Sequence, residues 1–218
     1  MNKVNPDFLS RADSRYPRAL ETWLGRAAPQ QIALVGNLDL LQEKPLALFC
    51  SNRCPGNLIL KTYDLAVELR DANIPVIGGF HTPMEQECLR LLLRGKQPVI
   101  ICLARALGKR QILPAYQQPL EQGRLLLISP FHAKQTRITA ATSAYRNRVV
   151  AALAARVFAA YAAPNGKTEQ FCREIAAWGK PVFTFKDEAN QNLVALGARS
   201  LLQTSEVSKT SDVCALDV

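Results

Sequence analysis

The sequence is poor in the residues from which metal and catalytic sites are usually built. Its 218 residues include only two histidines, His81 and His132, and aromatic residues make up 7% of the chain. Cys50 and Cys54 could form half of a zinc site, but no second half follows, and both histidines are distant in sequence. We therefore expect neither a metal nor a cofactor.

Familiar catalytic motifs are also missing. The segment APNGKTE contains Gly166-Lys167-Thr168, but a P-loop requires a glycine where this chain has Tyr161. A serine hydrolase of the α/β type needs a Gly-x-Ser-x-Gly elbow, and the sequence has none. The inventory favours a binding site over a hydrolytic triad and predicts that the protein is not an enzyme.

Long hydrophobic runs are absent. No stretch of 18 uncharged apolar residues occurs, so a transmembrane helix is not expected. The first twenty residues carry charges and proline where a signal peptide needs an apolar stretch. Most of the six cysteines lie in apolar runs, as Cys102 does in VIICLA, which is typical of buried free thiols. Together these features predict a cytoplasmic protein without a membrane partner.

What the chain does have is positive charge. The formal net charge is +9, and its distribution is uneven. Between residues 101 and 150, Glu121 is the single acidic residue, against eight basic ones: Arg105, Lys109, Arg110, Arg124, Lys134, Arg137, Arg146 and Arg148. A basic stretch can be only a solvated face, but an asymmetry of this size within one domain is typical of a surface that binds a polyanion.

Short apolar segments alternate with amphipathic ones along most of the chain. The expected strands are PLALFCS, IPVIGG, QPVIICLA, RLLLISPF, VFAAYAA and PVFTF, with ARSLL as a final edge strand. This rhythm predicts an α/β fold with a doubly wound, mostly parallel sheet and helices on both faces. We expect a helical and strand extension over residues 1–40, the core domain over 41–201, and a disordered tail over 202–218.

Ligands of such sheets bind beyond the carboxyl ends of the strands, so the loops there are the places to search. APNGKTE and the pair Gly78-Gly79 both look like glycine turns that feed a helix, whose first N–H groups favour an anion. Plain tight turns are the alternative for both. Arg146 and Arg148 are expected at the mouth of another helix, where an anion would offset their unfavourable position in the helix dipole. Alternatively, one of the two arginines is structural and pairs with Glu169 or Glu85.

The order of these loops resembles the DNA-processing protein A (DprA/Smf) family, over roughly residues 16–201. The segment RYPRAL…LVGNLDLL is similar to the family's entry, and CSN at 50–52 stands where the family has Gly-Ser-Arg, with Arg53 one place late. GGFHTPME stands at the position of the family's second loop. ISPF corresponds to the family's Ser-Glu-x-Pro loop, and NGKTE corresponds to its Ser-Gly-Ser/Thr loop. The Arg-Asn-Arg helix start is intact at 146–148, and QNLVALGA matches the closing motif.

The resemblance implies a Rossmann-like domain that binds single-stranded DNA, forms a homodimer and passes the strand to the RecA recombinase during natural transformation. From the charge distribution, the loops and the resemblance together, the residues expected to bind DNA or phosphate are Ser51, Arg53, Gly78, Gly79, Arg137, Arg146, Asn147, Arg148, Gly166, Lys167 and Thr168. Two basic positions of the family are Asn52 and Thr82 here, which marks a divergent, minimal member.

The same broad superfamily contains cytokinin-activating, lysine-decarboxylase-like enzymes that cleave nucleoside monophosphates. PNGKTEQF partly echoes their Pro-Gly-Gly-x-Gly-Thr-x-x-Glu signature, but it lacks the double glycine and places Glu169 directly after Thr168. A nucleotide-binding protein or a nucleoside-monophosphate N-glycosidase is therefore the alternative to a DNA-binding protein.

Overall fold

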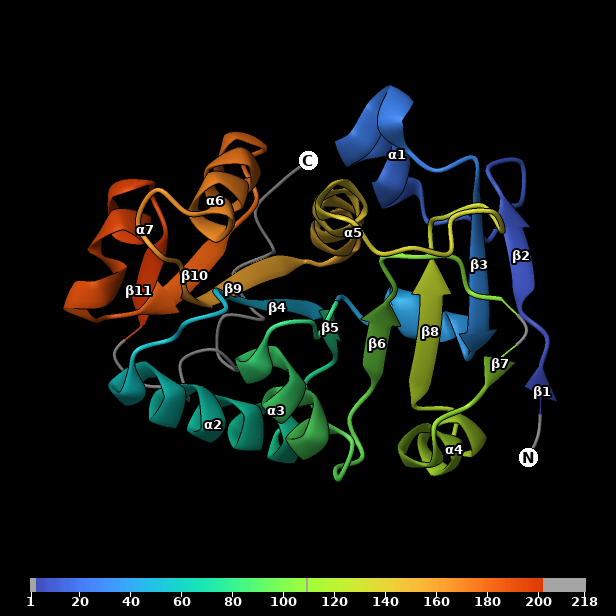
Figure 1. Cartoon of the computed structure of the whole chain (residues 1–218), viewed down its shortest axis with the longest axis horizontal. Coiled ribbons are helices and arrows are strands. Elements are labelled where there is room, and N and C mark those ends of the chain that lie inside the picture. Colours follow the sequence, from blue (N-terminus) through green and yellow to red (C-terminus); the bar gives the residue numbers. More distant parts are fainter. Residues whose placement is uncertain (1–2, 109, 202–218) are drawn as a thin grey trace. The chain divides into compact units, whose positions relative to one another are not determined.

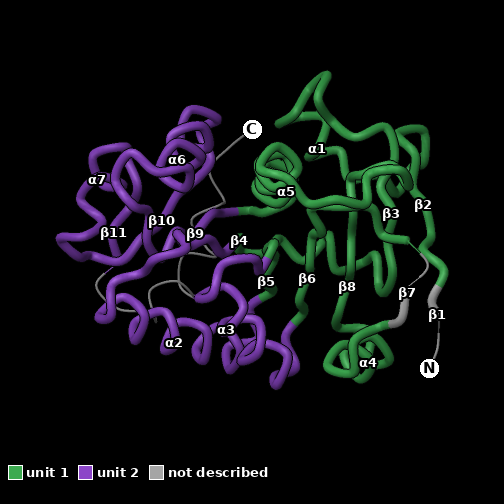
Figure 2. Tube along the Cα trace, in the orientation of Figure 1, with its two compact units in different colours: residues 1–47, 75–79, 98–155 green, residues 48–74, 80–97, 156–218 purple. Residues whose placement is uncertain are grey.

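The computed structural model describes residues 3–108 and 110–201, and it divides into two compact units. Unit 1 consists of residues 1–47, 75–79 and 98–155, and unit 2 of residues 48–74, 80–97 and 156–218 (Figure 2). The units do not follow the expected boundary at residue 40, which stays a prediction of the sequence. The tail expected over 202–218 lies outside the described residues. None of the described helices is long and apolar enough to cross a membrane.

Unit 1 is built on strands that pair in the order β5-β6-β8-β3-β2. They are β5 (Val76–Gly78), β6 (Val99–Cys102), β8 (Leu125–Ser129), β3 (Gln31–Gly36) and β2 (Asp7–Ser10). The first three are parallel, whereas β3 and β2 are antiparallel to their neighbours. β4 (Leu46–Cys50) begins here, parallel to β5. A separate short ladder joins β1 (Lys3–Val4) and β7 (Arg110–Gln111).

Helices cover both faces of the unit 1 strands (Figure 1). On one side, α5 (Ala140–Leu153) contacts β5 and β6, and α1 (Arg18–Leu24) packs on α5. On the other side, α4 (Pro114–Glu121) contacts β8. Two short 3-10 helices, η1 (Gly25–Ala27) and η2 (Leu38–Gln42), complete the unit. Every residue of β8 is buried, as expected for a strand between two helical layers.

Unit 2 repeats this arrangement with parallel strands alone. It contains β9 (Arg156–Tyr161), β10 (Val182–Phe185) and β11 (Arg199–Leu201), which pair in that order. α6 (Lys167–Ala177) and α7 (Gln191–Ala195) lie on one face, and α2 (Gly56–Asp71) and α3 (Pro83–Leu92) lie on the other (Figure 1). The 3-10 helix η3 (Glu188–Asn190) leads into α7.

The expected fold class is confirmed, and all seven expected strands are present as β4, β5, β6, β8, β9, β10 and β11. Thr82 is the N-cap of α3 and Pro83 is its first residue. The sequence did not predict β2. Three of the four residues of β2 are exposed, so the alternation that marks a half-buried strand is barely visible there.

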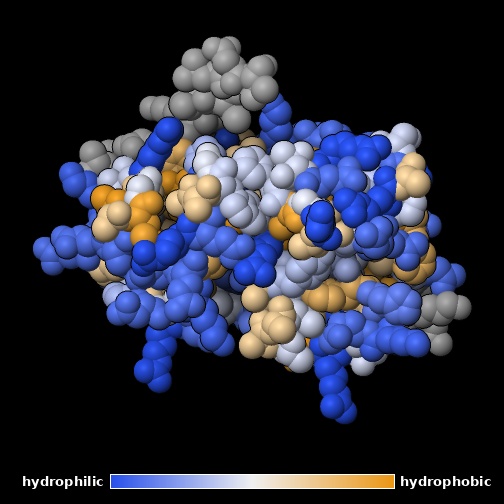
Figure 3. All heavy atoms as spheres, turned by 90° about the horizontal axis from the view of Figure 1, so that it is seen from above, coloured by the Kyte–Doolittle hydropathy of each residue, from blue (hydrophilic) through white to orange (hydrophobic). Residues whose placement is uncertain are grey.

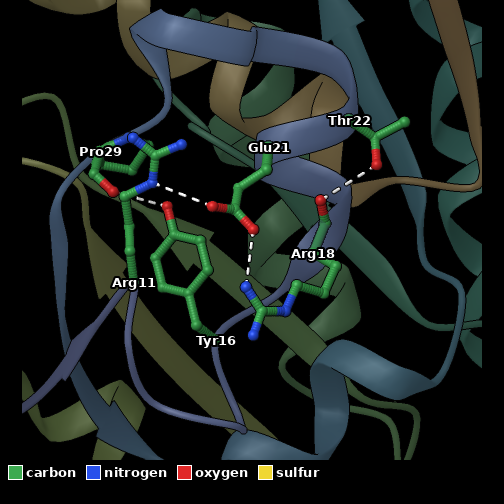
Figure 4. A network of polar contacts seen from close by, with 6 residues as sticks. All are labelled: Arg11, Tyr16, Arg18, Glu21, Thr22 and Pro29. Carbon is green, nitrogen blue, oxygen red and sulfur yellow. Dashed lines mark hydrogen bonds and ion pairs between the residues drawn. The ribbon is translucent and has the colours of Figure 1, made fainter.

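A network of polar contacts fixes the start of α1 in unit 1 (Figure 4). The carboxylate of Glu21 accepts hydrogen bonds from Arg11 Nε at 3.1 Å and Arg18 Nη1 at 2.8 Å. The Tyr16 hydroxyl donates to the carbonyl oxygen of Pro29 at 2.6 Å. Tyr16 is 2% exposed, and burial raises its pKa to about 12. Tyr16 therefore holds the α1 layer onto the strand that follows it.

Replacing Tyr16 with phenylalanine tests this anchor. Tyr16→Phe leaves the buried Pro29 carbonyl without its donor, so the free energy of unfolding should fall by about 1–3 kcal/mol. Thr22→Val is the matched control, because its exposed hydroxyl donates only to Arg18 O within the same helix, and it should change stability by less than about 0.5 kcal/mol. Urea denaturation with an unchanged slope measures both. Equal stability of the two variants would contradict the anchoring role.

Candidate functional site

The predicted site residues fall into two groups, one in each unit. Unit 1 contains Gly78, Gly79, Arg137, Arg146, Asn147 and Arg148, and unit 2 contains Ser51, Arg53, Gly166, Lys167 and Thr168. In both units these residues lie on loops at the carboxyl ends of parallel strands or on helices that follow such loops. Each group is described within its own unit.

Arg146 is a buried residue of α5. Its side chain is 4% exposed, Nη1 donates to the carbonyl oxygen of Cys102 at 3.1 Å, and Nε donates to Oδ1 of Asn147 at 2.8 Å. Cys102 is the last residue of β6, so the arginine closes the end of that strand. The remaining N–H groups of the guanidinium make no hydrogen bond to the residues that the structure describes.

Gly79 is a glycine because the Arg146 guanidinium lies against it. A Cβ atom at Gly79 would be 1.7 Å from Arg146 Nη1, which no side chain could tolerate without displacing the arginine. Its neighbour Gly78 is the last residue of β5 and pairs with Ile101 of β6. The structure thus brings Gly78, Gly79, Arg146 and Asn147 together at the ends of β5 and β6.

The expected anion-binding turn at Gly78-Gly79 is not found. The helix that follows, α3, has a capping box in which Thr82 Oγ1 accepts from Glu85 N and the Glu85 carboxylate accepts from Thr82 N. Glu85 also accepts from the N–H groups of His81 and Cys50. The protein's own side chains therefore satisfy N–H groups at the start of α3 that would otherwise bind an anion.

The expected position of the two arginines in the helix is also wrong. α5 begins at Ala140, with Thr139 as N-cap in a capping box with Thr142, so Arg146 and Arg148 lie well beyond its first turn. The helix dipole acts within the first turn and does not explain them. The polar segment before Ser143 hid the true start, because it lacks the apolar spacing by which a helix is recognised.

The aromatic residues next to this helix are structural. The Tyr145 hydroxyl donates to Ala27 O at 2.8 Å, and its ring meets Phe131 edge to face at 5.6 Å between centroids. These contacts place α5 against η1 and the loop after β8. In unit 2, Phe80 is 6% exposed, so its ring is too buried to stack on a nucleic-acid base.

Exposed cations are displayed on α5 and on the loop after β8. Arg148, Lys134 and Arg137 are all exposed, whereas Arg105 is half-buried on the loop after β6. Ser129 Oγ donates to Arg105 O at 2.8 Å, and Gln135 O accepts from Ala106 N at 2.7 Å, so the two loops are fastened together. Lys109, one of the eight basic residues between positions 101 and 150, lies outside the described residues.

The glycine turn before α6 in unit 2 has the features of a phosphate loop. Gly166 is the N-cap and supplies no side-chain acceptor, so the first-turn N–H groups are left for an outside ligand. A Cβ atom at Gly166 would be 2.8 Å from Ala163 O, so the tight turn requires glycine. Lys167 is exposed and Thr168 is half-buried, at the first two positions of the helix.

Ser51 lies against this turn, because its hydroxyl oxygen accepts a hydrogen bond from Ala163 N at 3.0 Å. Its own N–H donates to Tyr161 O at 2.9 Å, so the loop after β4 is joined to the end of β9. Arg53 follows on the same loop and is exposed. The structure therefore brings Ser51 and the α6 turn together, as the sequence predicted for a shared site.

Glu169 organises the turn, a role that the sequence did not reveal. Its Oε2 accepts from Asn165 N at 2.9 Å and from Asn192 Nδ2 at 2.7 Å, and its Oε1 accepts from Arg173 Nη2 at 3.1 Å. Asn165 has a positive φ of 59°, which is uncommon for a residue other than glycine. A glutamate three residues after an N-cap was the available signal.

The hydrogen bond from Asn192, followed by those from Asn165 and Arg173, lowers the pKa of Glu169 below its usual range. These bonds stabilise the fold above the pKa of an unfolded glutamate, and this contribution is lost as pH falls through the lower folded pKa. A general acid needs the opposite shift. The glutamate that an N-glycosidase would use is therefore committed to structure.

Thiols and metals play no visible part in these loops. Cys50, Cys88, Cys102 and Cys172 are buried, as expected, and Cys54 is half-buried. Burial raises the pKa of Cys102 to about 12, which disfavours a reactive thiolate. Within residues 3–108 and 110–201, no cluster of three histidine, cysteine, aspartate or glutamate residues could hold a metal ion. Cys214 lies outside this range.

The fold and the loops define a class: a parallel α/β protein with candidate phosphate-binding loops at the carboxyl ends of its strands. Comparison with family models identifies the family, because the model of DNA recombination-mediator protein A matches residues 7–212. The chain belongs to this family, which confirms the resemblance found in the sequence. A comparison with curated proteins gave no match.

Solved structures share the fold at low sequence identity. DNA processing protein A from Streptococcus pneumoniae matches with a TM-score of 0.76 and 19% identity, over 98% of this chain and 75% of that one. DNA processing protein A from Helicobacter pylori, whose structure was reported with a single-stranded DNA binding mode, matches with 0.76 and 17%, over 98% and 99%. The molybdenum cofactor carrier protein of Chlamydomonas reinhardtii is more distant, at 0.55 and 14%, over 79% of this chain and 100% of that one.

The two arginines of α5 should respond differently to mutation. Arg146→Ala leaves the buried Cys102 carbonyl without a donor, so it should lower the free energy of unfolding by about 1–3 kcal/mol. Arg148→Ala removes an exposed side chain and should cost less than Arg146→Ala does. Thermal and urea denaturation of both variants measure the difference. If Arg146→Ala is as stable as Arg148→Ala, Arg146 is not the structural member of the pair.

Proposed function

We propose that this protein binds single-stranded DNA as a recombination mediator of the DNA-processing protein A type. The observation that carries the proposal is the α6 turn, whose glycine N-cap leaves first-turn N–H groups uncapped beside the exposed Lys167. Helix N-termini of this kind are ready-made sites for phosphate. Family membership and the binding mode reported for the Helicobacter pylori relative support DNA as the source of that phosphate.

Each group of residues has a distinct role in this proposal. In unit 2, one phosphate is held by the N–H groups of Gly166–Thr168 and by Lys167, with the hydroxyl of Ser51 next to the turn and Arg53 exposed on the same loop. In unit 1, Arg148, Arg137 and Lys134 neutralise further phosphates. Arg146 positions the ends of β5 and β6 through Gly79 and Asn147. Contacts of this kind carry no base specificity.

Other partners follow from family membership alone. Homodimerisation and transfer of the strand to the RecA recombinase stay predictions. The face in Figure 3 is mostly hydrophilic, and its hydrophobic residues form several separate areas, so it does not favour one extended apolar interface.

A salt-series titration tests the DNA proposal. Each neutralised phosphate of a single strand contributes about −0.7 to the slope of log affinity against log salt. Lys167→Ala should therefore reduce the magnitude of the slope by about 0.7 and weaken binding of an oligothymidylate about fivefold near 0.1 M salt. Lys96→Ala, an exposed lysine after α3 in the same unit, is the matched control and should change neither quantity.

Two outcomes of this titration would contradict the proposal. The first is an unchanged affinity and slope for Lys167→Ala. The second is tighter binding of a nucleoside monophosphate than of the oligonucleotide, which would favour a nucleotide-binding protein. Mixed-sequence oligonucleotides should bind as thymidylates do, because phosphate contacts do not read bases.

The N-glycosidase alternative predicts a product that can be detected directly. The purified protein, incubated with the common nucleoside monophosphates, should release no free base by liquid chromatography, because Glu169 is held as a hydrogen-bonded carboxylate. Boiled protein and buffer serve as controls. Release of base by the native protein that disappears in Glu169→Gln would overturn the assignment as a binding protein.

A further inference from the structure

We propose that Asn192 is a positioning residue for phosphate binding: it sets the conformation of the α6 turn through Glu169. The inference rests on the proposed function, since the ligand of the turn is taken to be a DNA phosphate. Asn192 is 23 residues beyond Glu169 in the sequence and belongs to α7, so neither the turn motif nor its flanks identify it.

Asn192 uses a single amide nitrogen to join two elements. Its Nδ2 donates to the carbonyl oxygen of Ala162 at 3.0 Å and to Glu169 Oε2 at 2.7 Å. Ala162 directly follows β9, and Glu169 is in the first turn of α6. The side chain therefore fixes the distance between the end of the strand and the start of the helix, which is the span that the turn must cross.

The carboxylate oxygen held by Asn192 also holds the backbone of the turn. Glu169 Oε2 accepts from Asn165 N at 2.9 Å, and Asn165 is the residue with the positive φ. This conformation is sparsely populated for a residue with a side chain and persists only where its surroundings impose it. Asn165 directly precedes Gly166, so its conformation aims the N–H groups that follow. The chain of contacts runs from Asn192 through Glu169 to Asn165.

Asn190 provides an internal comparison. Its Nδ2 donates to Ala160 O at 3.0 Å, two residues before the carbonyl that Asn192 binds, and the side chain is fully buried. Successive carbonyls of this spacing point to the same side of a strand. The two asparagines thus bind carbonyls at the end of β9 and just beyond it in the same way, but Asn192 also donates to Glu169. Asn190 is structural, and Asn192 additionally acts on the turn.

The experiment compares Asn192→Ala with Asn190→Ala in two measurements on the full chain. In the salt-series titration with oligothymidylate, Asn192→Ala should weaken binding about fivefold near 0.1 M salt and reduce the slope by about 0.7, one contact. Asn190→Ala should lower the melting temperature more, because Asn190 is fully buried, and leave the slope unchanged. Asn192→Ser, which keeps one donor but cannot span both acceptors, is made in parallel in case the alanine variant does not fold.

The second measurement is amide hydrogen exchange at Asn165, followed by NMR without any ligand. Exchange should accelerate in Asn192→Ala and Asn192→Ser and stay at the wild-type rate in Asn190→Ala. Wild-type exchange at Asn165, or a wild-type slope in both Asn192 variants, overturns the positioning role. If the wild-type protein binds no oligonucleotide, the proposed function fails, whereas the exchange data still decide whether Asn192 sets the turn.

Discussion

The loops of unit 2 depend on buried carboxylates at the third position of a helix. Glu85 and Glu169 are 5% and 6% exposed, and burying such a group is costly unless hydrogen bonds replace its lost water. Backbone N–H groups supply those bonds: Cys50, His81 and Thr82 donate to Glu85, and Asn165 donates to Glu169. Glu85 thereby joins the end of β4 to the start of α3, and Glu169 holds the turn before α6. The carboxylates of Glu85 and Glu169 therefore fix the conformation of the candidate binding loops.

The helices α3 and α6 differ in which of their first-turn N–H groups are left without a side-chain acceptor. At α3 the threonine N-cap and Glu85 satisfy the first-turn donors, so the helix end is closed. At α6 the N-cap is a glycine, and Glu169 turns back to the loop rather than to the N-cap. A buried glutamate at the third helical position therefore closes the start of α3, whereas at α6 the first-turn N–H groups stay without a side-chain cap. In unit 1 a buried cation has a similar role, because Arg146 joins the end of β6 to Gly79. The exposed charges of this unit are those of Arg148 and its neighbours.

The sequence predicted the fold well and the site only in part. Apolar strands such as β6 and β8 are recognisable because burial on both faces makes them continuous hydrophobic runs. Loop residues such as Ser51 and Gly166 follow from topology, since parallel strands end at one edge. Gly79 could not be interpreted from the sequence, because a glycine in a tight turn and a glycine packed under a guanidinium look alike there. Asn192 and the bonds of Glu169 depend on long-range contacts that no local pattern encodes.

Thr82 and Asn52 replace two basic residues of the family pattern, and the structure gives a physical reason for the first. A basic residue at position 82 could not accept the hydrogen bond from Glu85 N, so the threonine that caps α3 excludes a DNA-facing cation at that position. Asn52 is exposed and removes a second charge from the neighbouring loop. In the proposed function, affinity for a polyanion comes from the α6 turn, whose backbone donors need no charged side chain, and from the cations of unit 1. The proposed function therefore assigns phosphate binding to the open helix end at α6 and not to the closed one at α3.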